Sequence, residues 1–185
     1  MHVEERVKNA FCTLTDHSPA ALKERMIECG ITLEELGPYL KDPDGNPYYR
    51  QMIYQDEHVE MIVMNWADIE CAPHDHGESS GWIFIMNGET KQTIYKGKGD
   101  KLPEPLFTEY KKKGRTLFAP KKGIHKMGGS GEDSLVTLHL YSPPIQGMKV
   151  YDLETCAACV VSADCGAWWP EEQRQRLKEI QLEED

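Results

Sequence analysis

The sequence has no long apolar run. None of its 185 residues belongs to a stretch that approaches the roughly 20 apolar residues of a membrane-spanning helix. Segment 1–11 also lacks the apolar centre of a secretory signal and carries acidic residues instead. These absences argue against a membrane partner and against export, so we expect a cytoplasmic protein.

Acidic residues outnumber basic residues in this chain. The chain has 21 Lys and Arg against 31 Asp and Glu, which gives a formal net charge of −10. Binding to nucleic acid needs a basic face that neutralises phosphates, so we expect no nucleic-acid partner. The run Lys111 to Lys113 is interpreted as solvated charge.

Cysteines are few and scattered, six in all, which predicts free thiols rather than a disulfide framework. Cys156 and Cys159 form a C-x-x-C pair, with Cys165 nearby. The alternative interpretation of these three cysteines is a zinc or redox site, although no fourth ligand stands at the usual spacing.

The two ends of the chain differ from its middle. Residues 1–40 are predicted to form a helical layer outside the main fold, because Ser18-Pro19 is typical of a helix start and Thr32 with Glu35 is typical of a capping box. Residues 152–185 are predicted to be an extension whose segment 171–185 is a helix, docked by Trp168 and Trp169.

The region 48–151 has the pattern of an antiparallel β-protein. Short segments rich in β-branched and aromatic residues alternate with turns, at 48–54, 59–66, 81–87, 91–95, 115–119 and 134–142. No internal repeat is present. We expect an all-β-dominated single domain over 1–185, built as a sandwich or small barrel with helices at both ends.

The stretch 72–89 contains the first candidate metal ligands. His74 and His76 can share one face of an extended chain while Asp75 points back. The alternating segment 82–86 supports a following strand, which Asn87-Gly88 closes with residues typical of a hairpin turn. The alternative is two polar residues in a loop.

His125 is the third candidate ligand. It follows a strand and the turn 120–123, which can direct its ring toward the first two histidines. Three neutral imidazoles suit Fe(II), Zn(II), Ni(II) or Cu(II) and leave half of an octahedral shell open, as catalysis requires. The alternative is an ordinary turn histidine.

The segment 137–141 places three polar side chains on one face of a strand, namely Thr137, His139 and Tyr141. If buried, they must hydrogen-bond one another, which predicts a relay that holds the phenol. The alternative is the solvated face of an edge strand.

Arg50 stands among aromatic residues and shares a strand face with Tyr48. A guanidinium in such a place suits bidentate binding of a carboxylate, so we interpret both residues as substrate-binding. The alternative for Arg50 is a surface ion pair.

Three motifs, HDHGESSGW, PKKGIH and TLHLYSPP, carry a resemblance over about 48–144. The chain is similar to the cupin superfamily and, within it, to the cysteine dioxygenase family. The resemblance implies a small antiparallel, jelly-roll type barrel with a metal inside, held by His74, His76 and His125. Cupins usually have a glutamate ligand where Gly81 stands. Mammalian family members have there a cysteine cross-linked to the tyrosine that matches Tyr141, so this chain resembles the bacterial type without that cross-link.

The implied activity is the Fe(II)-dependent oxidation of L-cysteine by O2 to cysteine sulfinic acid. Arg50 would hold the substrate carboxylate with help from Tyr48, and the Thr137–His139–Tyr141 face would place the catalytic phenol. A branch that acts on 3-mercaptopropionate has Gln at the position of Arg50, so Arg50 favours L-cysteine. The alternatives are a dioxygenase for another small thiol, a non-catalytic metal-containing cupin and, less favoured, a zinc isomerase or epimerase. We expect a monomer.

Overall fold

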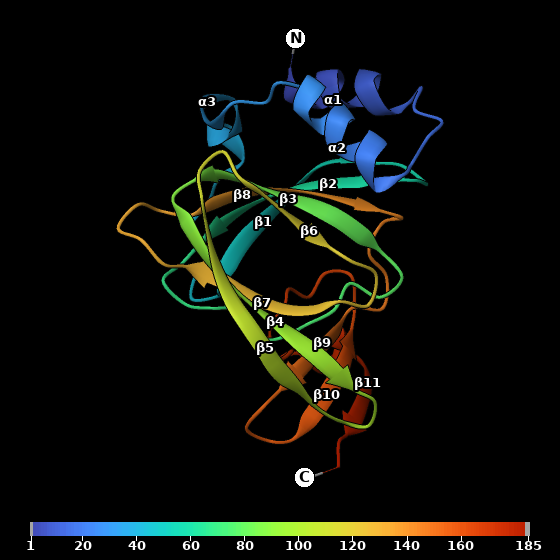
Figure 1. Ribbon diagram of the computed structural model, residues 1–185, viewed down its shortest axis with the longest axis vertical. Helices are drawn as coiled ribbons and strands as arrows, with labels where there is room; N and C mark the ends of the chain where they lie inside the picture. Colours follow the sequence, from blue (N-terminus) through green and yellow to red (C-terminus); the bar gives the residue numbers. More distant parts are fainter. Residues whose placement is uncertain (1, 184–185) are drawn as a thin grey trace.

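The computed structural model describes residues 2–183, and its N-terminal part is the helical layer that the sequence predicts (Figure 1). It contains helices α1 (Val3–Phe11), α2 (Pro19–Glu28) and α3 (Leu33–Leu36) and the 3-10 turn η1 (Gly37–Tyr39). The Ser18 side chain accepts a hydrogen bond from the Ala21 N–H at the start of α2. Thr32 and Glu35 form the predicted capping box.

Eleven strands among the described residues make up the rest of the fold. The first sheet has the order β1 (Tyr48–Gln55), β2 (Glu60–Trp66), β8 (Val136–Ser142), β3 (Ser80–Asn87), β6 (Thr116–Ala119). A second group has the order β5 (Lys101–Lys112), β4 (Glu89–Lys98), β7 (Ile124–Gly129), and a third has the order β11 (Arg176–Gln181), β10 (Ala157–Val161), β9 (Lys149–Asp152). All of the paired neighbours are antiparallel.

The first sheet is buried on both faces. One face packs under the helices through residues such as Met61, Val63 and Leu138, and Figure 1 shows α1 and α2 lying over it. The opposite face, with Ile62 and Ile83, forms the core between the sheets. Because successive strand residues alternate in direction, the even-numbered positions of β2 point into the barrel.

His74 joins the two smaller groups of strands. It forms isolated bridges to His125 on β7 and to Val150 on β9, so that the second and third groups together close the barrel opposite the first sheet. A candidate metal ligand therefore lies at the seam of the barrel wall, where its backbone is fixed from both sides.

The predicted C-terminal helix is wrong. Segment 171–183 contains the 3-10 turn η2 (Gln173–Gln175) and strand β11, which pairs with β10 through Ala158 and Ile180; residues 184–185 lie outside the described part. The open edge of β10 offers backbone hydrogen bonds, and pairing there buries Leu182 against Tyr95 and Ala158. These tertiary contacts outweigh the helix propensity of the segment. The tryptophans pack against the barrel core instead.

The turn at Asn87-Gly88 is also not a hairpin. Gly88 has a φ of +74°, but β3 pairs with β6 and β8, whereas β4 pairs with β5 and β7. The glycine therefore turns the chain from one sheet to the other. Among residues 2–183, none of the helices has the length and apolar character needed to cross a membrane.

Candidate metal centre

Backbone pairing places His74 opposite His125. The His74 N–H donates to the His125 carbonyl at 2.9 Å, and the His125 N–H donates back at 3.0 Å. Asp75 points away, as predicted, and its carboxylate accepts the N–H groups of Gly77 and Lys149. The His74 ring donates from Nδ1 to the Ala72 carbonyl at 2.9 Å, which leaves the Nε2 lone pair free.

A polar chain fixes the His125 ring in the same way. Its Nδ1 lies 2.7 Å from Gln92 Oε1, and the Gln92 amide nitrogen donates to Glu109 at 2.9 Å. Since the amide nitrogen is used by Glu109, the amide oxygen faces His125 and accepts from Nδ1. His125 therefore presents its Nε2 lone pair to the interior.

His76 completes the group from the loop between His74 and β3. Its Nε2 lies 3.4 Å from Nε2 of His125 and 3.4 Å from the Tyr141 hydroxyl. Its Nδ1 is a buried atom without a hydrogen-bond partner among the described residues. Ring contacts to His74, His125 and Tyr141, with centroids 4.8–5.0 Å apart, hold the ring in place.

The donor set of this group fits a metal ion. One nitrogen from each of His74, His76 and His125 lies within 4.8 Å of the others, and all three residues are buried. Burial lowers the pKa of His74 and, together with the neighbouring histidines, holds the pKa of His76 and His125 well below the ordinary value, so the rings are neutral. Neutral imidazoles that present nitrogens to a common point can ligate a metal ion, and metal–nitrogen distances of about 2.1 Å suit this spacing.

The predicted relay runs along β8, which lies between β2 and β3, so the alternative of a solvated edge strand is wrong. Thr137 Oγ1 accepts from the Trp66 indole at 2.8 Å and lies 2.7 Å from His139 Nε2. His139 Nδ1 lies 2.9 Å from the Tyr141 hydroxyl. Burial lowers the pKa of His139 to about 3, so its ring is neutral and carries a single N–H.

The fixed donor of the relay is Trp66, because an indole N–H can only donate, and the Thr137 oxygen accepts from it. When the Thr137 hydroxyl donates to His139 Nε2, the His139 proton lies on Nδ1 and is donated to the oxygen of Tyr141. In this tautomer the phenol proton of Tyr141 is directed at the histidine group.

Tyr141 occupies the space beside Gly81. A Cβ at Gly81 would lie 2.5 Å from the Tyr141 ring and 2.3 Å from the Leu140 carbonyl oxygen, so the position accepts no side chain. Burial holds the pKa of Tyr141 well above its ordinary value. The phenol therefore keeps its proton at neutral pH and acts as a donor.

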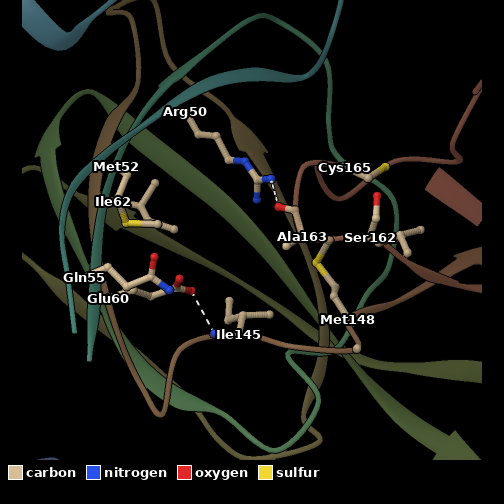
Figure 2. Close-up of a pocket in the computed structure, with 12 residues that line it drawn as sticks. Arg50, Met52, Gln55, Glu60, Ile62, Ile145, Met148, Ser162, Ala163 and Cys165 are labelled. Atoms are coloured by element: carbon tan, nitrogen blue, oxygen red, sulfur yellow. Dashed lines mark hydrogen bonds between the residues drawn. The ribbon is translucent and has the colours of Figure 1, made fainter. Parts of the chain in front are cut away.

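Arg50 and Tyr48 both line the cavity that contains the three histidines. The Arg50 guanidinium donates to the Ala163 carbonyl in the segment after β10 (Figure 2). The Tyr48 hydroxyl accepts the Ala167 N–H at 2.7 Å, and its ring packs on Trp66 and on Trp168. These side chains thus tie the C-terminal segment to the barrel beside the histidines.

Two cavities meet at Arg50. The inner cavity at the histidines has a volume of about 20 Å³, which is room for roughly one water. The outer cavity has a volume of about 290 Å³ and shares Arg50, Ile62, Ile145 and Met148 with the inner one. A small molecule can therefore lie mainly in the outer cavity while it extends one group toward the histidines.

The cysteines do not form a second centre. All six are free, and Cys159 and Cys165 are buried in the barrel core. Among residues 2–183, the side chains gathered closely enough to hold a metal are the three histidines. The zinc or redox group considered for Cys156, Cys159 and Cys165 is thus not formed in the described part of the chain.

Comparison with known proteins identifies the family of this chain and its architecture. The family model for cysteine dioxygenase type I matches residues 40–154, more than half of the chain. The chain belongs to the cysteine dioxygenase family. Among curated relatives, cysteine dioxygenase type 1 of Danio rerio is 28% identical over 149 residues, which is 68% of this chain and 72% of that protein. The Rattus norvegicus protein is 24% identical over 148 residues, with the same coverage.

Solved structures show the fold. A protein with a double-stranded β-helix domain from Klebsiella pneumoniae has a TM-score of 0.52 and 17% identity, over 63% of this chain and 94% of that one. An oxalate oxidase in complex with glycolate has a TM-score of 0.51 and 17% identity, over 63% of this chain and 61% of that one. The predicted antiparallel cupin barrel is confirmed. Membership of the family supports a dioxygenase that acts on a small thiol.

Several residues at the site were not predicted from the sequence. Gln92 orients His125, Trp66 begins the relay, and Glu60 lines the outer cavity. Gln92 is 2% exposed, but it stands in a strand made mostly of polar and charged residues, so the sequence pattern does not mark it as an inward residue. No signal in the sequence indicated that β4 supports a ligand on β7.

Replacing Gln92 with leucine is expected to weaken metal binding by about 10- to 100-fold, because Nδ1 of His125 loses its acceptor and the ring loses its fixed tautomer. Competition titration against a chelator measures this affinity. Thr93→Val is the matched control, since Thr93 bonds to Thr108 instead of to a histidine. Equal affinities for Gln92→Leu and wild type would show that Gln92 does not orient the ligand.

Proposed function

We propose that the protein is an Fe(II)-dependent dioxygenase that converts L-cysteine and O2 to cysteine sulfinic acid. The observation that carries this proposal is the common cavity in which three converging imidazoles, the guanidinium of Arg50 and the phenol of Tyr141 meet. His74, His76 and His125 would hold the iron. When bound, Fe(II) supplies open positions at which a thiolate and O2 can react.

Arg50 provides the contact that favours a carboxylate. Its guanidinium has five N–H groups, so it can keep the bond to Ala163 and still present a second edge to a ligand. A carboxylate held on that edge fixes one end of a small thiol while the sulfur extends toward the histidines. Ile62 and Met148 form apolar walls that displace water from the bound molecule.

Tyr141 places a proton beside the reacting atoms. The relay from Trp66 through Thr137 and His139 leaves the phenol proton directed at the histidine group, where it can hydrogen-bond an oxygen or a substrate carboxylate. The non-catalytic alternative offers no use for such a fixed phenol.

Three further features remain predictions: that the metal is iron, that the protein lies in the cytoplasm, and that it is a monomer.

Replacing Tyr141 with phenylalanine is expected to lower kcat by about 10- to 100-fold and to leave metal content unchanged, because the ring still fills the space beside Gly81 while the donor is lost. Steady-state kinetics and metal analysis on the same sample measure both quantities. Tyr54→Phe, a change outside the cavity lining, serves as the control. An unchanged kcat would remove the phenol from the mechanism.

The choice of thiol tests the proposed substrate. Iron-loaded protein in an oxygen electrode is expected to consume O2 faster with L-cysteine than with 3-mercaptopropionate or cysteamine, because these lack the amine and the carboxylate respectively. Equal or higher kcat/KM with 3-mercaptopropionate would overturn the assignment to L-cysteine. It would leave the thiol dioxygenase intact.

A further inference from the structure

One wall of the two cavities is a short loop, residues 143–149, which we call the wall segment. Its Ile145 and Met148 side chains line both the inner and the outer cavity. Figure 2 shows these two side chains close to each other, with Arg50 on the other side of the cavity. The inner cavity has a volume of only about 20 Å³, so a small shift of the wall changes the room beside the histidines by a large fraction.

The wall segment is bonded to residues 74–79, the ligand segment, which carries His74 and His76. The Asp75 carboxylate accepts the Lys149 N–H at 3.1 Å, and the Asp75 N–H donates to the Lys149 carbonyl at 3.0 Å. At the other end of the wall segment, the Ser79 hydroxyl donates to the Pro143 carbonyl. Both ends of the wall are therefore held by the segment that carries two of the metal ligands.

Gly77 brings the two segments into backbone contact between these ends. It has a φ of +60°, and a Cβ there would lie 2.4 Å from the Gln146 carbonyl oxygen, so the close approach requires glycine. The Asp75 oxygen that accepts from Lys149, Oδ1, also accepts the Gly77 N–H at 3.0 Å. Asp75 is thus the side chain that fixes both the turn of the ligand segment and the end of the wall segment.

This arrangement limits how far Met148 can move from the histidines. The Met148 carbonyl accepts the Val161 N–H at 2.9 Å, and the next residue, Lys149, is bonded to Asp75. A wall held in this way does not retreat when a branched molecule enters. In such a packed pocket, one additional methyl group changes kcat/KM by roughly 10- to 200-fold.

We propose that Asp75 is a positioning residue that determines specificity: by bonding the Lys149 backbone it holds Met148 against the substrate space and excludes thiols branched at the carbon that bears the sulfur. This inference rests on the proposed thiol oxidation and names how that site selects among thiols. The role depends on an acceptor oxygen at this position and not on its charge, because the partners are neutral backbone N–H groups.

The test compares L-cysteine with L-penicillamine, which carries two methyl groups on the carbon next to sulfur and is otherwise the same molecule. The preference for L-cysteine is measured as the ratio of the two kcat/KM values from O2 uptake, and as the ratio of the two Kd values from calorimetry without O2 on iron-loaded protein. Partial loss of iron cancels in the kcat/KM ratio, since both thiols meet the same active fraction. Wild-type protein should prefer L-cysteine by at least about tenfold.

The variants separate the acceptor from the wall. Asp75→Ala should lower the preference at least about fivefold, whereas Asp75→Asn should stay within about twofold of wild type, because its amide oxygen accepts the same N–H groups. Met148→Ala removes the wall side chain itself and should lower the preference as well. Adding Asp75→Ala to Met148→Ala should change it little further, because the two residues act through one contact.

Asp152→Ala is the matched control. The Asp152 carboxylate also accepts backbone N–H groups, those of Glu154 and Thr155, but it lies in the turn after β9 and lines neither cavity. The preference for L-cysteine should be unchanged in this variant. A general loss of stability from a missing carboxylate would appear in both aspartate variants and would not alter the choice of thiol.

A wild-type protein that binds and oxidises the two thiols equally well would overturn the proposal. So would an unchanged preference in Asp75→Ala, or a preference lost as fully in Asp75→Asn. If Asp75→Ala does not fold, Met148→Ala decides, since continued exclusion of L-penicillamine would show that this wall does not select. Failure of the proposed function has a different signature: no O2 would be consumed with either thiol, while the Kd ratio would still report the selection.

Discussion

Replacing His125 with alanine is expected to abolish both metal retention and thiol oxidation. The loss should exceed the roughly 10- to 100-fold that removal of an outer hydrogen bond costs, because a direct ligand is lost. The backbone bonds between His74 and His125 do not depend on the ring, so the two segments should stay paired in the variant. Metal analysis after gel filtration, followed by O2 uptake with L-cysteine, measures the two effects.

His58→Ala is the matched control for this experiment. His58 is exposed in the turn before β2 and its ring stacks on that of His17, away from the cavity lining. It should retain full metal content and activity. Thermal unfolding of both variants separates loss of the ligand from loss of the fold. A folded His125→Ala protein that keeps its metal would contradict the three-histidine site.

Replacing Arg50 with glutamine is expected to raise KM for L-cysteine by about 10- to 100-fold, because a charge-assisted hydrogen bond to the substrate carboxylate is lost. KM for cysteamine, which has no carboxylate, should change little. Initial rates with both thiols measure the difference.

Arg50→Lys is the informative companion variant. It keeps the charge and loses the two-pronged geometry, so its KM for L-cysteine should fall between wild type and Arg50→Gln. Arg50 also bonds the Ala163 carbonyl, so a disturbed C-terminal segment would impair both thiols alike. Such a parallel loss would assign Arg50 a structural role and remove it from carboxylate binding.

The parts of the fold that the sequence predicted have strong local patterns. The inward face of β8 follows from period 2 along 137–141, and the helix starts at Ser18 and Thr32 follow from capping residues. The convergence of the three histidines was expected from the motifs and is observed in the structure. The roles of Arg50, Tyr48 and Tyr141 remain proposals.

The parts that were missed depend on contacts distant in sequence. Segment 171–183 contains helix-forming residues, and its pairing with β10 cannot be read from those residues alone. Strand β5 was missed because most of its residues are exposed, apolar ones such as Leu106 and Phe107 included, so that the strand shows no apolar alternation. Glu60 lies at the start of a strand buried on both faces, so the pattern of β2 does not distinguish an inward carboxylate.

Isotope labelling of the product tests the central claim most directly. A dioxygenase that converts R–SH and O2 to R–SO2H places both atoms of one O2 molecule in the product. Iron-loaded protein turning over L-cysteine under ¹⁸O2 should therefore yield cysteine sulfinic acid that carries two ¹⁸O atoms by mass spectrometry. Formation of cystine without sulfinate, or sulfinate that carries oxygen from water, would contradict the account.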